Sequence, residues 1–344
     1  MILSGLITVD NRPTGGVNSR AGHLAVAGQK GQHIDEAVAA AAKLGAHHLG
    51  PAAALVHRLD GLRERNRLVG GNGGALFTPD MDERLKSRQE MDAALRHALV
   101  QREFHLFYQP QIELATGELA GAEALARWTH PTLGPISPAQ FIPAAEETGL
   151  IVELGRWALN AACAEAANWP AELKIAVNVS PVQFELSNLV GDIKDALART
   201  GLDAWRLEVE ITEGIFVKDF EATTAKLREI RQLGVGIALD DFGTGYSSLS
   251  YLGQLPVDKL KIDQSFTKRL PADTEAAAII RAVIGLGESL GKRIIAEGIE
   301  TADQAWMLQM MGCRLGQGYH FGRPMSAADF AERLAGSDSL AMSA

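Results

Sequence analysis

Seven short strand-like segments in the last two-thirds of the chain each end in polar residues. Such residues are not needed for the packing of a buried strand. The segments are AEALAR, AVNVS, LEVEIT, IALDDFGTG, LKID, IIAEGIE and LGQGYHF, and they carry Glu123, Asn178, Glu210, Asp240, Asp241, Lys261, Asp263, Glu297, Glu300 and Gln317. Carboxylate and amide oxygens are hard ligands that suit Mg²⁺ or Mn²⁺ rather than zinc. If the strand ends meet at one mouth, these residues predict a site for divalent metals and a phosphate ester.

Taken singly, these residues differ in what they indicate. Glu123 alone is more typical of a salt-bridge partner, and Lys261 alone is more typical of a structural lysine. Asp240 and Asp241 favour a metal, because adjacent carboxylates repel each other and the FGTG after them can turn both toward one point. Lys261 could hold a water or a phosphate oxygen, or act as a base with a lowered pKa. Together the acids suffice for two metals, which suit in-line displacement at phosphorus.

Alternation along the strands indicates where these side chains point. Successive side chains of a strand face opposite sides, so in LEVEI the three aliphatic residues share one face and Glu208 and Glu210 share the other. The aliphatic face suits helix packing, and the charged face would point into a barrel. The charged positions fall near the carboxyl ends of their strands, which is the end that carries the active site in (β/α) barrels.

Repeated strand and helix patterns predict the elements that position this site. We expect a linker helix over residues 77–100 and a first strand over 103–112, whose turn at 115–121 makes the first strand pair antiparallel. Helical patterns follow over residues 138–169, 189–201, 220–234, 275–291, 301–312 and 327–336. Eight strands in about 240 residues fit a closed (β/α)8 TIM-type barrel, an α/β fold.

The first 76 residues differ from the rest of the chain. They are rich in Gly, Ala and His, include VGGNGG, and show one plausible helical stretch over residues 34–44. Adjacent His47 and His48 lack partners at metal-ligand spacing, so we interpret them as solvated. We expect residues 1–76 to be a short irregular segment, disordered or the remnant of a degenerate domain, followed by the linker helix, a barrel over 101–336 and a tail over 337–344.

Charge and composition exclude several classes of protein. The net charge is −9; residues 1–79 contribute +3, and the remaining −12 argues against a DNA- or RNA-polymer binder, which needs a basic face. No apolar run reaches the length of a membrane span and the first residues do not form a signal peptide, so we expect a cytoplasmic protein without membrane insertion. Cys163 and Cys313 lack metal-like spacing, and we expect buried thiols rather than a disulfide.

The segments resemble the EAL-domain family of cyclic di-GMP phosphodiesterases from about residue 81 to residue 334. The motifs that carry the resemblance are YQP, EALARW, NVS, EITE, DDFGTGYSS, KID, AEGIE and QGYHFGRP. The resemblance implies a TIM-type barrel with an antiparallel first strand, which agrees with the prediction from the strand patterns. It also implies a homodimer and the presence of two Mg²⁺ or Mn²⁺ ions in each site.

The same resemblance implies a role for each residue that matches a motif. Ligands of the first metal would be Glu123, Asn178, Glu210 and Asp240, and ligands of the second would be Asp240, Asp241 and Glu297. Lys261 would orient the attacking water, and Glu213 would brace the loop 241–248 that couples the site to the dimer interface. The substrate would meet Arg127, backed by Leu125, together with Gln109 and Gln317. Asp263 and Glu300 would be supporting acids.

The implied reaction is hydrolysis of one 3′–5′ phosphodiester of cyclic di-GMP, which gives linear pGpG. No motif residue departs from the family pattern, and residues 1–76 contain no GGDEF motif, so we expect no cyclase activity. One alternative is a catalytically inactive cyclic di-GMP receptor. Others are an enolase-like lyase with Lys261 as its base, which the DDFGTG loop and the Asn ligand fit poorly, and a structural partner-binding protein, which would leave the acid cluster unexplained.

Overall fold

The computed structural model describes residues 79–216, 219–243 and 252–341, and the chain divides into two compact units, Met1–Pro79 and Asp80–Ala344. The expectations for residues 1–76, and those for residues 244–251 of the DDFGTGYSS segment, lie outside the described residues. The second unit contains the barrel and all of the predicted site residues.

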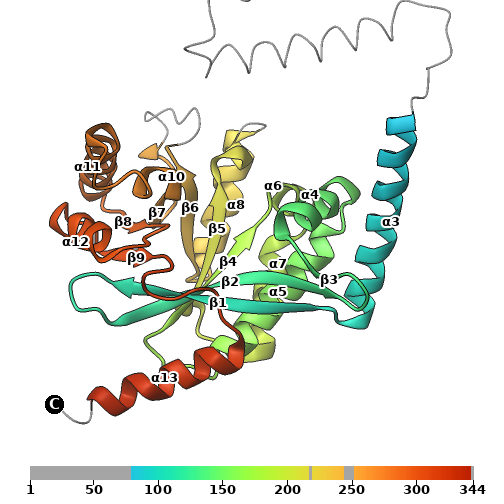
Figure 1. The fold of residues 1–344 in the computed structure, drawn as a ribbon, viewed down its shortest axis with the longest axis horizontal. Coiled ribbons are helices and arrows are strands. Elements are labelled where there is room, and N and C mark those ends of the chain that lie inside the picture. Colours follow the sequence, from blue (N-terminus) through green and yellow to red (C-terminus); the bar gives the residue numbers. More distant parts are fainter. Residues whose placement is uncertain (1–78, 217–218, 244–251, 342–344) are drawn as a thin grey trace, which may run out of the picture. The chain divides into compact units, whose positions relative to one another are not determined.

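Eight strands of this unit close into a barrel (Figure 1). The unit has nine described strands, all of which except β3 belong to the barrel: β1 (Phe104–Glu113), β2 (Leu119–His130), β3 (Gly134–Ile136), β4 (Lys174–Val179), β5 (Leu207–Thr212), β6 (Gly236–Phe242), β7 (Lys259–Ile262), β8 (Arg293–Ala296) and β9 (Leu315–Gln317). Their order is β1-β9-β8-β7-β6-β5-β4-β2, and β2 also pairs with β1, which closes the ring, while β3 adds to the outer edge of β2. Strand β1 runs antiparallel to both of its neighbours, so the predicted barrel with an antiparallel first strand is confirmed.

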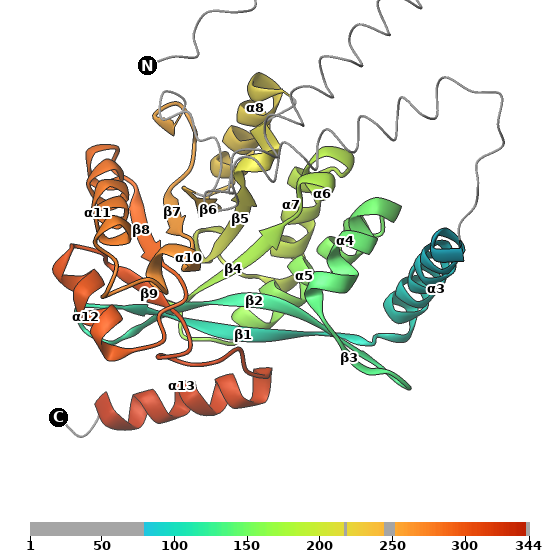
Figure 2. The same cartoon turned by 45° about the horizontal axis from the view of Figure 1, so that its top comes forward.

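The β1–β2 hairpin is longer than the barrel wall that it contributes. Its register runs from Phe104 opposite Trp128 to Ile112 opposite Leu119, and only the stretch from Gly121 to Ala124 also pairs with β4. Beyond that stretch β2 continues to His130 and pairs with β3. Figure 2 shows the two strands as a ribbon that extends past the barrel toward β3.

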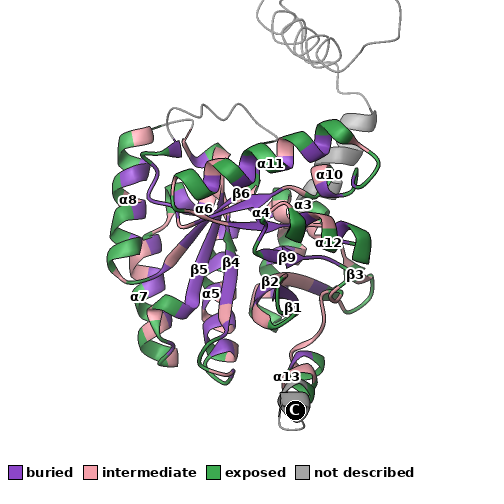
Figure 3. Ribbon diagram, turned by 90° about the vertical axis from the view of Figure 1, so that its left-hand side faces the viewer, coloured by how far each residue is buried: buried purple, intermediate pink, exposed green. Residues whose placement is uncertain are grey.

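Helices surround the strands on the outside. They are α3 (Pro79–Gln101), α4 (Pro138–Thr148), α5 (Ile151–Ala166), α6 (Pro181–Leu186), α7 (Leu189–Thr200), α8 (Phe220–Gln232), α10 (Gln264–Thr267), α11 (Thr274–Ser289), α12 (Ala302–Met310) and α13 (Ala327–Ala341), with 3₁₀ turns η1 (Ala204–Arg206) and η2 (Glu213–Phe216). Figure 3 shows buried strands inside and helices whose outer faces are exposed. This arrangement places the aliphatic faces of the strands against the helices, as the alternation predicted.

Local sequence explains where these helices begin and end. Ser137 caps α4 and is followed by Pro138, while Gly149 ends the helix with a left-handed φ of 76°. The helices expected over residues 138–169 are α4 and α5. At the other end of the chain α13 continues to Ala341, five residues into the segment expected to be a tail. No helix among the described residues combines the length and the apolar composition needed to cross a membrane.

Two apolar cores hold this unit together. The larger core fills the space between the barrel strands and their helices, and the smaller one, with Leu95, Phe104, Trp128 and Phe141 at its centre, joins α3 and α4 to the extended part of the hairpin. Cys163 and Cys313 are free thiols buried in the larger core, which confirms the prediction for both.

Candidate active site

The carboxyl ends of the barrel strands bring most of the predicted site residues together. Asn178 is the next-to-last residue of β4, Lys261 is the next-to-last residue of β7, Gln317 ends β9 and Glu297 directly follows β8. Glu123 is an exception, because it lies in the first half of β2 rather than at its end. It still lies at the mouth, because the pairing of β2 with β4 ends one residue later, at Ala124.

The buried ammonium of Lys261 lies at the centre of this arrangement. The Nζ of Lys261 is near one oxygen of each of four carboxylates, at 2.5 Å from Glu210 Oε2, 2.7 Å from Glu297 Oε1, 3.1 Å from Asp240 Oδ1 and 3.9 Å from Glu123 Oε1. The side chain of Lys261 is only 1% exposed. Four acids thus share one cation, and the local charge is strongly negative.

Burial and the surrounding charges shift the pKa of Glu297, Glu210 and Lys261. Burial, together with the neighbouring carboxylates, raises the pKa of Glu297 to about 7 and raises the pKa of Glu210 well above its usual value. Burial opposes the charge of Lys261, but the four surrounding acids outweigh it and hold the lysine pKa well above its usual value. The direction of this shift favours a protonated Lys261 over the alternative of a base with a lowered pKa.

Glu123 differs from the other acids because amide groups hold both of its oxygens. Its Oε1 accepts a hydrogen bond from Asn178 Nδ2 at 2.6 Å, and its Oε2 accepts one from Gln317 Nε2 at 2.5 Å. Burial raises the pKa of Glu123, but the charge of Lys261 and these hydrogen bonds lower it further than burial raises it. Glu123 is thus a carboxylate in a fixed orientation, and the carbonyl oxygen of Asn178 is left for another partner.

Asp240 and Asp241 lie side by side at the end of β6. The pairing of β6 with β7 shifts register between Leu239 and Phe242, and Asp241 has a φ of 54°, which is uncommon for a residue other than glycine. The backbone N–H of Asp241 donates to Asp240 Oδ1 at 2.9 Å. Asp241 thus already adopts a turn conformation inside the strand, just before the FGTG segment from which we expected the turn; Thr244 and Gly245 of that segment lie outside the described residues.

A hollow of about 270 Å³, which we call the mouth hollow, opens above these residues. Its lining is mainly polar and consists of Gln109, Glu123, Leu125, Arg127, Asp240, Lys261, Gln264, Lys268, Glu297, Gly298, Glu300, Gln317, Gly318, Tyr319 and Pro324. Every residue expected to meet the substrate is in this set. Asn178, Glu210 and Asp241 are not in this set.

The remaining predicted residues occupy the edge of the site. Arg127 is partly buried, donates to Ala126 O at 2.9 Å and lies 5.5 Å from the centre of the Phe107 ring. Asp263 caps α10 by accepting from the N–H of Ser265 at 2.9 Å, so part of its role is structural. Glu300 is about half exposed.

Glu213 begins η2 directly after β5, and its charge contributes to the raised pKa of Asp241, although burial and Asp240 contribute more. This places Glu213 close enough to Asp241 to influence it electrostatically. Most of the loop that Glu213 was expected to brace lies outside the described residues.

Apart from Gly298 and Gly318, which line the hollow, five residues of the site were not singled out from the sequence. Gln264, Lys268, Tyr319 and Pro324 line the mouth hollow, and Gln111 donates to Gln317 Oε1 at 3.1 Å. Tyr319 and Pro324 lie in the QGYHFGRP motif, which also contains the predicted residue Gln317. Gln111 follows the predicted residue Gln109 by two positions and therefore shares its strand face. Gln264 and Lys268 gave no such signal.

The donor set suits hard divalent cations, although the described residues contain no group of three or more acidic, histidine or cysteine side chains that converge as metal ligands. Instead, the carboxylates face the ammonium of Lys261. The buried Oε1 of Glu210 has no hydrogen-bond partner among the described residues. Carboxylate and amide oxygens, a surplus of negative charge and an unsatisfied buried oxygen all fit a site for such cations.

Comparison with known proteins places this site in a family. A family model described as EAL domain matches residues 92–324. Among curated proteins, the cyclic di-GMP phosphodiesterase PA2567 of Pseudomonas aeruginosa is 42% identical over 275 residues, which are 79% of this chain and 46% of that protein. The chain spans 31% to 38% of the length of three other curated relatives.

Solved structures agree with this assignment. A structure titled PaMucR phosphodiesterase, c-di-GMP complex, is 44% identical with a TM-score of 0.68 and covers 70% of this chain and 99% of its own. The BlrP1 manganese/cyclic di-GMP complex of Klebsiella pneumoniae is 31% identical with a TM-score of 0.59 and covers 65% of this chain and 56% of its own.

Proposed function

The chain belongs to the EAL domain family, and we propose that it hydrolyses cyclic di-GMP to linear pGpG with two divalent metal ions. The observation that carries the proposal is the convergence of four carboxylates on one lysine at the carboxyl ends of the barrel strands. The names of PA2567 and PaMucR, and the cyclic di-GMP in the PaMucR complex, support the choice of substrate.

Six side chains would hold the metal ions in two sets that share one carboxylate. The sets are Glu123, Asn178, Glu210 and Asp240 for the first ion, and Asp240, Asp241 and Glu297 for the second. The unsatisfied Oε1 of Glu210 and the raised pKa of Glu297 support this choice, because both would be relieved by a cation. Mg²⁺ or Mn²⁺, when bound, would lower the pKa of a water and offset charge on the phosphoryl oxygens. The manganese in the BlrP1 complex supports the metal class.

Lys261 would orient the attacking water. Its ammonium contacts Glu210 and Glu297, and the surrounding acids raise the lysine pKa, which supports a role as a hydrogen-bond donor. An N–H of Nζ could then donate to the water oxygen, which leaves a lone pair of that oxygen to face the phosphorus. Glu123 would keep the first ligand set in place through its two amide donors. Glu213 would brace the loop that follows Asp241.

The reaction would proceed by in-line displacement at one of the two phosphodiesters. The water oxygen bonds to phosphorus and loses a proton, and the bond from phosphorus to the 3′ oxygen breaks as that oxygen gains a proton. The phosphate remains on the 5′ carbon, so the product is linear pGpG. Arg127, backed by Leu125, would contact a phosphate in the mouth hollow, with Gln109 and Gln317 as further contacts. Asp263 and Glu300 would act as supporting acids at the edge of the hollow.

A chromatographic assay of purified protein with cyclic di-GMP and Mg²⁺ or Mn²⁺ tests this function. We expect pGpG from the wild type and a loss of about a hundredfold or more in the Glu123→Gln variant, since several kcal/mol of transition-state stabilisation depend on the metal. Glu229→Gln, at an exposed position of α8, is the matched control and should behave as the wild type. Ca²⁺ should support little turnover, because it prefers looser coordination than Mg²⁺.

Two other outcomes of this assay would contradict the proposal. Tight binding of cyclic di-GMP by the wild type without pGpG would identify a receptor, and full turnover with Ca²⁺ alone would contradict the two-metal assignment. The proposal also includes a homodimer, which sedimentation velocity of the full chain would test.

A further inference from the structure

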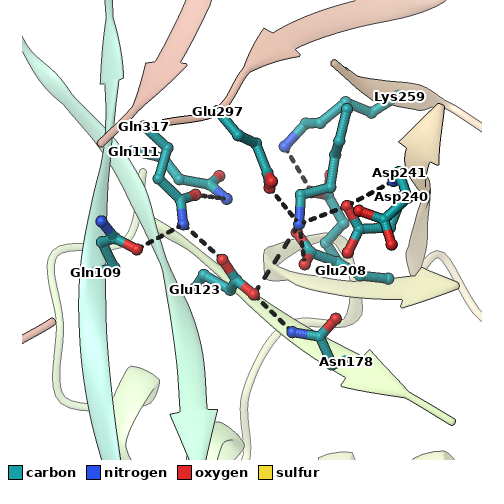
Figure 4. A network of polar contacts seen from close by, with 12 residues as sticks. Gln109, Gln111, Glu123, Asn178, Glu208, Asp240, Asp241, Lys259, Glu297 and Gln317 are labelled. Atoms are coloured by element: carbon teal, nitrogen blue, oxygen red, sulfur yellow. Dashed lines mark hydrogen bonds and ion pairs between the residues drawn. The ribbon is translucent and has the colours of Figure 1, made fainter. Parts of the chain in front are cut away.

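A chain of side-chain amides runs along the inner face of the barrel and ends on Glu123 (Figure 4). Gln111 Nε2 donates to Gln317 Oε1 at 3.1 Å, and Gln317 Nε2 donates both to Glu123 Oε2 at 2.5 Å and to Gln109 Oε1 at 3.1 Å. Gln109 Nε2 in turn donates to the carbonyl oxygen of Gly322 at 3.3 Å. The four side chains that take part are all buried.

The two ends of the chain fix the orientation of every amide in it. A carboxylate and a backbone carbonyl can only accept hydrogen bonds. Gln109 must therefore present its NH₂ to Gly322 and its oxygen to Gln317. Gln317 must use its NH₂ for both Gln109 and Glu123. Its own oxygen is then left buried and needs a donor, and Gln111 is that donor.

The backbone holds these partners in register. Gln109 and Gln111 are two residues apart on β1, so their side chains share the inner face. Gln109 lies opposite Glu123 on β2, and Gln111 lies opposite Gln317 on β9. Strand β1 thus brings the donor and both members of the Gln317–Glu123 pair to the same face.

We propose that Gln111 is a positioning residue for the reaction: by donating to Gln317 it keeps the Gln317 amide turned with its NH₂ toward Glu123, and so fixes the Glu123 carboxylate. This inference rests on the proposed function, in which Glu123 holds a metal ion. Without a donor at position 111 the buried oxygen of Gln317 loses its partner, and the cost of leaving it unsatisfied opposes the orientation in which its NH₂ faces Glu123. Glu123 would then lose a donor and the fixed orientation of its carboxylate.

A double-mutant cycle tests the inference, with Gln111→Met, Gln317→Met and the variant that combines them. Met has nearly the shape of Gln and cannot donate. Each variant is assayed for kcat and KM with cyclic di-GMP, for Mn²⁺ affinity by calorimetry without substrate, and for thermal unfolding. Gln183→Met is the matched control, because Gln183 is a buried glutamine on α6 outside the site.

We expect Gln111→Met to lower kcat and Mn²⁺ affinity each by about tenfold while KM changes by less than about twofold, as for partners that orient metal ligands. If Gln111 acts only through Gln317, adding Gln111→Met to Gln317→Met should change either quantity by less than about twofold. Gln183→Met should leave kcat and Mn²⁺ affinity unchanged.

The inference would be overturned if the effects of the two substitutions on kcat and Mn²⁺ affinity multiplied in the double variant. It would also be overturned if Gln111→Met kept the wild-type kcat and Mn²⁺ affinity. A wild type that binds Mn²⁺ but does not turn over cyclic di-GMP would refute the proposed hydrolysis, and the cycle would still be decided by Mn²⁺ affinity. A wild type that binds no Mn²⁺ would overturn the inference too, since Glu123 would then hold no ion.

Discussion

Among single residues, Lys261 has the largest influence on the electrostatics of the site. It is the cation that four carboxylates share, and its side chain is 1% exposed. A buried charge that loses its partner is costly, because nothing in the interior replaces the water that once solvated it. The lysine therefore contributes to folding as well as to the proposed chemistry.

Replacing Lys261 should separate these two contributions. We expect Lys261→Met to lower the free energy of unfolding by about 3–5 kcal/mol in chelator, because four acids, of which Glu123 and Glu210 are buried, lose their common cation. Activity should fall as well, since no ammonium would remain to orient water. Urea unfolding measures the first effect, and Lys194→Met at an exposed position of α7 is the control. Equal stability of Lys261→Met and wild type would show that the acids are neutral without the lysine.

The pKa of Glu297 predicts how stability depends on pH. Because its folded-state pKa is raised from 4.5 to about 7, the folded protein binds more protons than the unfolded chain between these values. Stability from this group should therefore fall as pH rises from about 4.5 to about 7. Glu297→Gln removes the effect, so its stability relative to the wild type should improve by roughly 2 kcal/mol between about pH 5 and pH 8.

Urea unfolding at both pH values, with chelator present, measures this difference. Glu229→Gln should run parallel to the wild type across the range, because its side chain is exposed on α8. A Glu297→Gln curve that also runs parallel to the wild type would mean that Glu297 titrates normally in the folded protein.

At the level of secondary-structure elements, β5 and β7 carry two buried ion pairs that follow each other along the barrel. Below the Lys261–Glu210 pair, Lys259 Nζ lies 2.5 Å from Glu208 Oε1, and both side chains are at most 2% exposed. Arg293 is the next cation, at 3.8 Å from Glu208 Oε2. Each pair follows from alternation, because positions two apart on each strand share the inner face.

The Lys259–Glu208 pair should show the asymmetry of buried ion pairs. Lys259→Met alone should destabilise the protein by about 3–5 kcal/mol, since Glu208 loses its close partner. Combining it with Glu208→Leu should recover most of this loss, because no buried charge is left unpaired. Urea unfolding of the single and double variants measures the effect. If the double variant is no more stable than Lys259→Met, the pair itself is what holds the strands together.

At the largest scale, the second unit has the cores that it needs to fold alone. The larger core lies between barrel strands and helices, and the smaller core ties α3 and α4 to the hairpin, with all of their residues between 91 and 334. A unit with its own apolar cores is expected to fold independently.

A protein of residues 80–344 should therefore fold cooperatively and hydrolyse cyclic di-GMP. Circular dichroism and thermal unfolding of this fragment, compared with the full chain, measure the first property, and the chromatographic assay measures the second. We expect a single cooperative transition, because both cores are retained. A fragment that lacks such a transition would mean that residues 1–79 supply part of the barrel's stability.

The class of fold and most of the site could be predicted from local sequence. Segments such as LEVEI alternate apolar and polar residues, and helical patterns lie between them, which together predict the barrel. Burial of one face of a strand or helix gives the sequence a regular spacing of apolar residues, and this spacing can be recognised without the structure. The same alternation predicts that Glu210 and Lys261 point inward. These features depend on residues that are close together in the sequence, so they can be predicted from it.

How the inward residues pair depends on the tertiary structure. Glu123 reaches the mouth from the middle of β2 because of where β2 leaves β4, and Asp241 turns beside Asp240 because of a register shift against β7. The pKa of Lys261 is raised because acids on four other segments of the barrel surround it. The role proposed for Gln111 depends on Gln317, 206 residues away. Register and distance between strands are set by long-range packing, and that information is absent from any local stretch of sequence.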